Sequence, residues 1–216
     1  MDNDRRAAYE TLRSVDDGIR SIFTALEDRG VLDNTVVVFL SDNGFLYGEH
    51  RYNGKLAVYE ENVRTPLAIR YPGATAKVEP ALASNVDLAS TITELTGAAA
   101  AIPQDGQSLV PLLTGPAPAG WYEDGLLLEK QRHTGKPNFW AVRTTDYKYV
   151  ELDSNTNGVR DNADEIELYD LTSDPLELVS QCTGTIGVPQ CTPSYVTVQQ
   201  TLSVKLAALK AAPPGG

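Results

Sequence analysis

The sequence predicts an α/β protein with a mostly parallel sheet flanked by helices, followed by a small C-terminal antiparallel sheet and a closing helix. Amphipathic helices and short apolar strands alternate in the first half, as they do in βαβ units. Short aromatic and β-branched runs separated by turns fill the second half, which is typical of antiparallel strands. We expect the first part to cover residues 1–118 and the second residues 119–216.

Composition limits the classes of partner. The chain has 216 residues, 42% of them hydrophobic, and a net charge of −11. This charge argues against nucleic acid or an anionic membrane, because both require basic patches. An anionic substrate stays open, since a local cation can reverse the sign within a site. The sequence has no run of 18 apolar residues, so we expect no membrane span.

Two features bear on the cellular compartment. The start, Met1–Arg6, is polar and leads directly into a helix, which predicts no signal peptide in this chain. Cys182 and Cys191 could form a local disulfide, which would suit a secreted or periplasmic protein. Two cysteines alone do not fix the compartment, and the sequence leaves their pairing open.

The first elements predict half of a βαβ unit. Gly30 is suited to end an amphipathic helix that has one buried stripe, and a turn then leads to an apolar strand at 35–40, buried on both faces. The expected preceding strand is missing, so the chain would begin in the middle of a fold. The stripe recurs at steps of three and four residues and comprises Tyr9, Leu12, Val15, Ile19, Ile22, Phe23 and Leu26.

A second strand and helix follow. Residues 66–71 read as a strand closed by a Pro-Gly turn. Ser84 is suited to be an N-cap, with Asp87 three residues later in the capping-box position, and the helix should end before Gly97. The linker-like stretch 115–120, rich in Gly, Pro and Ala, predicts the boundary between the two parts.

The second part should be a four-stranded antiparallel sheet. Its strands are expected at 125–129, 139–143, 147–151 and 166–169. A final amphipathic helix over residues 195–210 should cover it, with Val198, Leu202, Leu206 and Leu209 on its apolar face.

The stretch that follows the first strand carries the chemistry. Asp42 and Asn43 stand directly after the strand, where ligand sites of open α/β sheets lie. They offer a carboxylate and an amide oxygen, which are ligands suited to Ca²⁺ or Mg²⁺. The continuation brings Gly48-Glu49-His50, Lys55, Tyr59-Glu60-Glu61, Arg64-Thr-Pro-Leu67 and Pro72-Gly73 in that order.

This ordered series resembles the sulfatases of the alkaline-phosphatase-like superfamily, and the resemblance covers nearly the whole chain. Further matches include Asn85–Leu88, Asp105–Leu109, Tyr147–Tyr149 and Glu167–Leu171. Within the family the chain is most similar to enzymes of the N-acetylglucosamine-6-sulfatase type. The resemblance implies a partial sulfatase fold and a sulfuric ester hydrolase whose substrate is a sulfated small molecule or glycan.

The resemblance also implies roles for four residues. Asp42 and Asn43 would be two ligands of one active-site Ca²⁺. Lys55 would contact the substrate sulfate, with His50 near it. A divalent cation and an ammonium would stabilise the negative charge that develops during sulfate ester cleavage. Alternatives remain: Lys55 could be a solvated lysine, and His50 a structural histidine. His133 could reach the substrate rim, although a surface-loop histidine is the simpler interpretation.

The family nucleophile is absent from this sequence. A formylglycine arises from Cys or Ser in Cys/Ser-x-Pro-x-Arg, and the near match Cys191-Thr-Pro-Ser-Tyr195 lacks the arginine. We therefore expect this chain alone to be inactive and its other metal ligands to come from an N-terminal sulfatase half. Two other interpretations are a non-catalytic subunit or degenerate module, and a phosphodiesterase or phosphomutase of the same superfamily. The parent enzyme is expected to be secreted or periplasmic.

A second metal pattern lies in the small sheet. Asp153–Asp164 has oxygen-bearing residues at positions 1, 3, 5, 9 and 12 and glycine at position 6, as in a calcium loop. Position 12 is Asp rather than Glu, and the flanks read as strands. A structural Ca²⁺ and a metal-free polar hairpin are the two alternatives, with the hairpin slightly favoured.

Overall fold

The computed structural model describes residues 2–130, 137–153 and 161–212. Short 3-10 helices lie at Leu32–Asn34, Glu49–Arg51 and Pro193–Tyr195. The α-helices are α1 (Asp2–Asp28), α2 (Glu60–Val63), α3 (Asp87–Thr96), α4 (Val110–Thr114) and α5 (Val196–Ala211). The strands are β1 (Val37–Leu40), β2 (Leu46–Tyr47), β3 (Asn53–Gly54), β4 (Leu67–Arg70), β5 (Leu126–Lys130), β6 (Asn138–Arg143), β7 (Tyr147–Asp153), β8 (Glu165–Asp170), β9 (Cys182–Gly184) and β10 (Pro189–Cys191).

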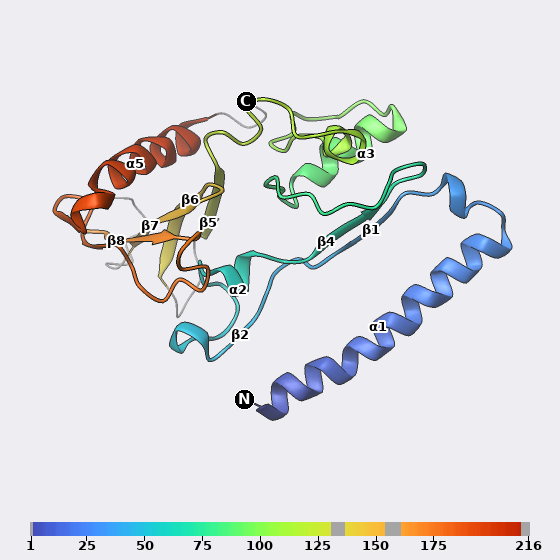
Figure 1. Ribbon diagram of the computed structural model, residues 1–216, viewed down its shortest axis with the longest axis horizontal. Coiled ribbons are helices and arrows are strands. Elements are labelled where there is room, and N and C mark those ends of the chain that lie inside the picture. The colour runs from blue at the N-terminus through green and yellow to red at the C-terminus, as the bar shows by residue number, and fades with distance from the viewer. Residues whose placement is uncertain (1, 131–136, 154–160, 213–216) are drawn as a thin grey trace.

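The C-terminal sheet confirms the sequence prediction. Strands β5, β6, β7 and β8 pair in that order, each antiparallel to its neighbour. Helix α5 lies along this sheet, as Figure 1 shows. A disulfide joins Cys182 in β9 to Cys191 in β10, so the pairing that the sequence left open is formed.

Side chains of β6 and β7 alternate between two apolar clusters, as a period of two requires. On one face, Leu202 and Leu206 of α5 pack against strand residues that include Trp140, and Cys182 joins the same cluster. On the other face, Phe139, Ala141 and Val150 pack with Val58. The sheet is therefore covered on its second face by the chain that follows the candidate site loop.

The first part differs from the expected parallel sheet. Strand β1 pairs with β4, and this pairing is antiparallel, with Val38 opposite Ile69. Among the described residues these two strands form a sheet of their own. The expected burial on both faces is also wrong, because Phe39 and Leu40 of β1 are 43% and 38% exposed. Short apolar strands do not encode the direction of their partner, so pattern alone could not decide this point.

Helix α1 forms where the periodicity predicts it, but its apolar stripe is exposed. It extends away from the rest of the molecule in Figure 1. Tyr9, Leu12 and Ile22 are each more than half exposed. The prediction of a buried stripe is therefore wrong for most of its positions, and only Ile19, Phe23 and Leu26 of the stripe are partly buried. An exposed apolar stripe of this length marks a surface suited to packing against further polypeptide.

Helix α3 confirms one half of the expected capping box. The carboxylate of Asp87 accepts a hydrogen bond from the Ser84 backbone N–H at 2.7 Å. The Ser84 hydroxyl does not cap the helix, and α3 begins at Asp87 itself. Gly97 closes the helix in the left-handed conformation, as predicted.

The boundary near residue 118 stays a prediction. Tyr122 and Trp121 lie beyond it, yet they donate hydrogen bonds to Asp87 and to the Leu82 carbonyl before it.

Within the described ranges, no helix combines the length and apolar character needed to cross a membrane.

Candidate functional site

The candidate metal ligands lie in a tight loop at the end of β1. Asp42 accepts a hydrogen bond from the Asn43 backbone N–H at 2.9 Å, which is ordinary geometry for an Asp-led turn. Asn43 donates from its amide to the Gly44 carbonyl at 2.9 Å. This leaves the amide oxygen of Asn43 as an acceptor, and the ammonium of Lys55 lies 3.5 Å from it. The structure thus brings Asp42, Asn43 and Lys55 together.

The meeting of Lys55 with Asn43 follows from a reversal of the chain. Strands β2 and β3 pair antiparallel, with Leu46 opposite Gly54. Gly54 adopts a φ of 101°, which favours glycine, and it returns the chain towards the β1 loop. Residues that are separated by about a dozen positions in sequence thereby share one site.

These oxygens fit part of a Ca²⁺ site. The side chains of Asp42 and Asn43 offer hard oxygen donors at adjacent positions. Calcium takes six to eight oxygen ligands, so two residues form an incomplete set. The ammonium of Lys55 also lies beside the Asn43 amide oxygen. A bound metal ion and this ammonium would therefore share one oxygen. The donor chemistry fits the ion, and further ligands must complete it.

Helix α2 and the residues directly after it hold the loop in place by hydrogen bonds. The Gly44 backbone N–H donates to the Asn62 carbonyl at 2.7 Å, and Thr65 donates from its hydroxyl to the Ser41 carbonyl at 3.2 Å. A Cβ placed on Gly44 would lie 1.9 Å from the Glu61 carbonyl oxygen. Glycine at this position is therefore required by the close approach of two backbones.

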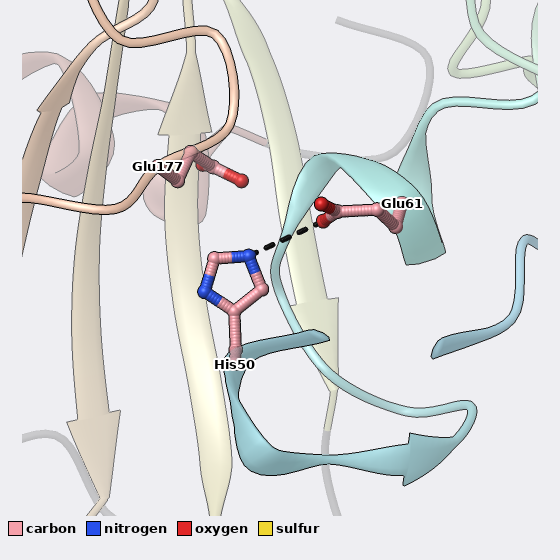
Figure 2. A group of neighbouring side chains, drawn as sticks. All are labelled: His50, Glu61 and Glu177. Atoms are coloured by element: carbon pink, nitrogen blue, oxygen red, sulfur yellow. Dashed lines mark ion pairs between the residues drawn. The ribbon is translucent and has the colours of Figure 1, made fainter. Parts of the chain in front are cut away.

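His50 belongs to a different cluster. Its ring stacks on Tyr59 with a centroid separation of 3.8 Å, and its Nε2 lies 3.3 Å from a carboxylate oxygen of Glu61 (Figure 2). The imidazole is 91% buried, because its side chain is 9% exposed. These contacts favour the structural interpretation of His50, while its role near the sulfate stays a prediction.

The same cluster includes Glu177, and the three side chains place ligand atoms within 4.8 Å of one another. A metal ion does not fit well there. Lys148 lies 2.7 Å from one oxygen of Glu177, and the Glu60 backbone N–H donates to the other at 2.6 Å. Both oxygens of Glu177 are thus engaged, and a cation would lie beside an ammonium.

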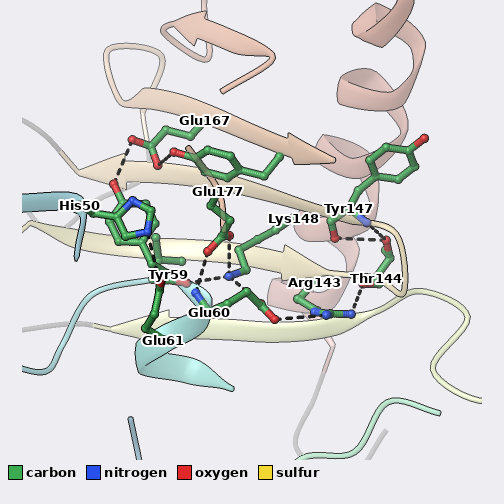
Figure 3. Close-up of polar contacts among 12 residues, drawn as sticks. His50, Tyr59, Glu60, Glu61, Arg143, Thr144, Tyr147, Lys148, Glu167 and Glu177 are labelled. Carbon is green, nitrogen blue, oxygen red and sulfur yellow. Dashed lines mark hydrogen bonds and ion pairs between the residues drawn. The ribbon is translucent and has the colours of Figure 1, made fainter. Parts of the chain in front are cut away.

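A buried charge network joins α2 to the C-terminal sheet (Figure 3). Lys148 is fully buried and lies 2.8 Å from Glu60, which also faces Arg143 at 3.3 Å. Burial alone would raise the pKa of Glu60, but Lys148 and Arg143 outweigh it, so this pKa is lowered. Burial raises the pKa of Glu177, which shares Lys148 with Glu60, and it raises the pKa of Glu167 as well.

Sequence reasoning missed this network. A signal was available in Lys148, a charged residue flanked by Tyr147, Tyr149 and Val150 within a predicted strand. An interior charge in such a strand requires a buried partner. The partners Glu60 and Glu177 are distant in sequence, so they could not be assigned without the fold.

The remaining predicted sites fall partly outside the described residues. His133 lies outside them, as do residues 154–160 of the second calcium pattern. Its ends, Asp153 and Asp164, are described and fully buried. Burial raises the pKa of Asp164, and one of its oxygens has no hydrogen-bond partner among the described residues. Cys191 is held in a disulfide, which agrees with rejecting it as a formylglycine precursor.

Comparison with known proteins identifies the family of the chain. The family described as N-sulphoglucosamine sulphohydrolase, C-terminal, matches residues 48–211. An N-acetylglucosamine-6-O-sulfatase of Bacteroides thetaiotaomicron is 36% identical over 180 residues, covering 78% of this chain and 30% of that protein. The chain thus spans about a third of the length of this curated relative.

Solved structures give the same class. A protein in complex with its substrate D-glucosamine-2-N,6-O-disulfate has a TM-score of 0.75 and 31% identity, covering 94% of this chain and 40% of that one. A phosphonate monoester hydrolase of Agrobacterium radiobacter has a TM-score of 0.73 and 28% identity, covering 91% and 39%. The fold is part of the α/β fold of the alkaline-phosphatase-like superfamily. Within that superfamily, the chain belongs to the sulfatase family.

Proposed function

We propose that this chain is the C-terminal portion of a sulfuric ester hydrolase that acts on a sulfated carbohydrate. The observation that carries the proposal is the meeting of Asp42, Asn43 and Lys55 at the end of β1, in a chain of the sulfatase family. The substrate class is supported by the relative that acts as an N-acetylglucosamine-6-O-sulfatase and by the neighbour solved with a sulfated glucosamine.

Lys55 supplies positive charge to the sulfate. Cleavage of the sulfate ester bond develops negative charge on the sulfuryl oxygens and on the leaving oxygen, and a nearby ammonium stabilises it. Asn43 holds the ammonium of Lys55 beside the loop through its amide oxygen. With the substrate bound, the ammonium would turn from this neutral oxygen to an anionic one, which is the stronger partner.

Asp42 and Asn43 would hold the Ca²⁺ that the family implies. When bound, the ion supplies a Lewis acid that neutralises charge on the sulfuryl group. Asp42 contributes the carboxylate and Asn43 the amide oxygen. A metal held by these two residues alone should bind weakly, since Ca²⁺ requires more oxygen ligands.

The nucleophile and the remaining ligands are proposed to come from an N-terminal sulfatase half, in the same longer polypeptide or as a separate partner. Supporting this, the sequence contains no Cys/Ser-x-Pro-x-Arg, and several apolar side chains of α1 and β1 are exposed, among them Leu12, Ile22 and Phe39. Those faces are suited to bury further polypeptide. The alternative of a non-catalytic subunit or degenerate module would use the same surface.

The experiment is a chimera. Residues 35–211 replace the matching segment of the Bacteroides thetaiotaomicron relative, and release of sulfate from N-acetylglucosamine-6-sulfate is measured. We expect an active chimera and a loss of about 10²–10³-fold in kcat for Lys55→Ala. Lys77→Ala serves as control, because Lys77 pairs with Glu79 on the surface. A folded chimera whose activity is indifferent to Lys55→Ala would refute the proposed role, and turnover by the 216-residue chain alone would refute the need for another half.

A second candidate is hydrolysis of phosphonate or phosphate esters. The similarity to a phosphonate monoester hydrolase supports it, since the fold hosts both chemistries. Adding p-nitrophenyl phenylphosphonate and p-nitrophenyl sulfate to the chimera assay separates the two. Faster turnover of the phosphonate would favour this alternative over the sulfatase.

A second, structural Ca²⁺ at the Asp153–Asp164 loop is also proposed. The burial of the Asp153 and Asp164 carboxylates supports it, because a cation would offset this burial. Within the described part of the chain, one oxygen of Asp164 also lacks a hydrogen-bond partner. Calcium should raise the melting temperature of the chain, and Asp164→Asn should abolish this rise. An equal rise in the variant would favour the metal-free hairpin.

The parent enzyme is proposed to be secreted or periplasmic. The disulfide between Cys182 and Cys191 supports this compartment, because such bonds persist in oxidising environments. Export of the full-length parent can be tested by fractionation, and its recovery in the cytosol with both thiols reduced would contradict the proposal.

A further inference from the structure

Residues 57–63 connect the candidate site to the C-terminal sheet through one buried lysine. Lys148 of β7 donates to the Val58 carbonyl at 2.9 Å and lies 2.8 Å from Glu60 and 2.7 Å from Glu177. The contact with Val58 is a hydrogen bond and the two carboxylate contacts are ion pairs, so the buried ammonium faces three oxygens. In Figure 3 the side chains of Glu60 and Glu177 converge on Lys148.

Glu177 fixes the start of the same helix. It accepts a hydrogen bond from the Glu60 backbone N–H at 2.6 Å, so it serves the first amide of α2 from a distant part of the chain. Its side chain is fully buried, which restricts it to one position. Lys148 and Glu177 together tie both the backbone and a side chain of α2 to the sheet.

The other side of α2 contacts the site loop. The Asn62 carbonyl accepts the hydrogen bond of Gly44, directly after Asp42 and Asn43. The Asn62 side chain accepts from the Ala57 backbone N–H at 3.4 Å, two residues after Lys55. One short helix thus contacts the loop of the metal ligands and the segment that follows the sulfate-binding lysine.

We propose that Lys148 and Glu177 are positioning residues, which fix α2 against the C-terminal sheet and thereby set the geometry of Asp42, Asn43 and Lys55. The proposal rests on the proposed function, because that function gives the loop its role. Neither residue touches the loop itself. Their effect is transmitted through the backbone contacts of Gly44 and Asn62.

The test is amide hydrogen exchange of the 216-residue chain, followed by NMR without metal or substrate. In Lys148→Met the apolar stem remains and the ammonium is lost, so the Gly44 amide should exchange at least about tenfold faster relative to the amides of β6 and β7. Lys130→Met is the matched control, since Lys130 is also a buried lysine of this sheet and donates to the Pro137 carbonyl. Its Gly44 amide should be unchanged.

A second pair of variants separates positioning from charge. Glu177→Ala removes the acceptor of the Glu60 amide, whereas Glu177→Gln keeps an oxygen there. We expect faster exchange of the Glu60 and Gly44 amides in the first variant and rescue in the second. The proposal is overturned if the Gly44 amide keeps its protection. It is also overturned if the exchange rate of this amide rises by the same factor as the rates of the β6 and β7 amides, which is what a merely structural role predicts. Failure of the sulfatase assay would leave these exchange rates as they are, so the two proposals fail separately.

Discussion

The clamp between Gly44 and α2 allows a sharp prediction for Gly44→Ala. The new Cβ would lie 1.9 Å from the Glu61 carbonyl oxygen and 3.0 Å from the Asn62 Cα. All the atoms it meets belong to the backbone, so no side-chain rotation relieves the overlap. The loop must move by at least about 1 Å, because Cβ contacts shorter than 3.0 Å are essentially never observed.

Two terms set the size of the effect. Overpacking in a closely packed region costs about 1–3 kcal/mol. Loss of the hydrogen bond between Gly44 and Asn62 adds about 1 kcal/mol. We therefore expect Gly44→Ala to lower the free energy of unfolding by about 2–4 kcal/mol, or to displace the loop that carries Asp42 and Asn43.

Urea titration followed by circular dichroism measures this change, and the NMR shifts of the Asp42 and Asn62 amides report on the loop. Gly18→Ala in α1 is the control, since a Cβ there meets nothing within 4 Å. In that helix the change should stabilise by about 0.5–1 kcal/mol. An unfolding free energy of Gly44→Ala within about 0.5 kcal/mol of the wild type, with unshifted amides at Asp42 and Asn62, would refute the close-packing argument.

Three further changes test other parts of the structure. Replacing Cys182 and Cys191 by serine should lower the free energy of unfolding by about 2–3 kcal/mol, and dithiothreitol should do the same to the wild type but not to the variant. Hydrogen bonds, chiefly from Thr172, lower the pKa of Asp170 to about 2, so its contribution is complete above about pH 4 and is lost as pH falls through 2. Asp170→Asn should remove this acid dependence of the urea midpoint. Asp87→Ala should cost at least about 3 kcal/mol in thermal unfolding, because the amides of Ser84 and Gln107 lose a buried acceptor; a cost below 1 kcal/mol would contradict that role.

The C-terminal sheet could be predicted from the sequence because its signals are local. Alternation along β6 and β7 assigns Phe139 and Trp140 to opposite faces, and both faces are covered in the structure. The four-residue spacing of Leu202 and Leu206 likewise gives α5 one apolar face, which covers one face of the sheet. A period of two and a period of 3.6 are properties of neighbouring residues, so these elements need no knowledge of distant chain.

The first part could be predicted only in its elements. The direction of the pairing between β1 and β4 and the exposure of α1 depend on which segments meet in space. His50 shows the same limit at the level of one side chain: the sequence did not indicate that its ring contacts Tyr59 and Glu61, and its place near the sulfate stays a prediction. The contact of Lys55 with Asn43 is seen only in the structure, and the role of both in binding stays a prediction.

The connection between sheet and loop bears on what a C-terminal part contributes to an enzyme of this kind. An appended domain would contact the catalytic loop through a few exposed, adaptable side chains. Here Lys148 is fully buried and pairs with Glu60 of α2 and with Glu177. Losing one partner of such a buried charge network costs much stability. Its charges cannot be separated without leaving an unpaired ion inside, so α2 and the C-terminal sheet should move as one body. If so, the geometry of Asp42, Asn43 and Lys55 is a property of the C-terminal sheet as much as of the strand that carries the loop.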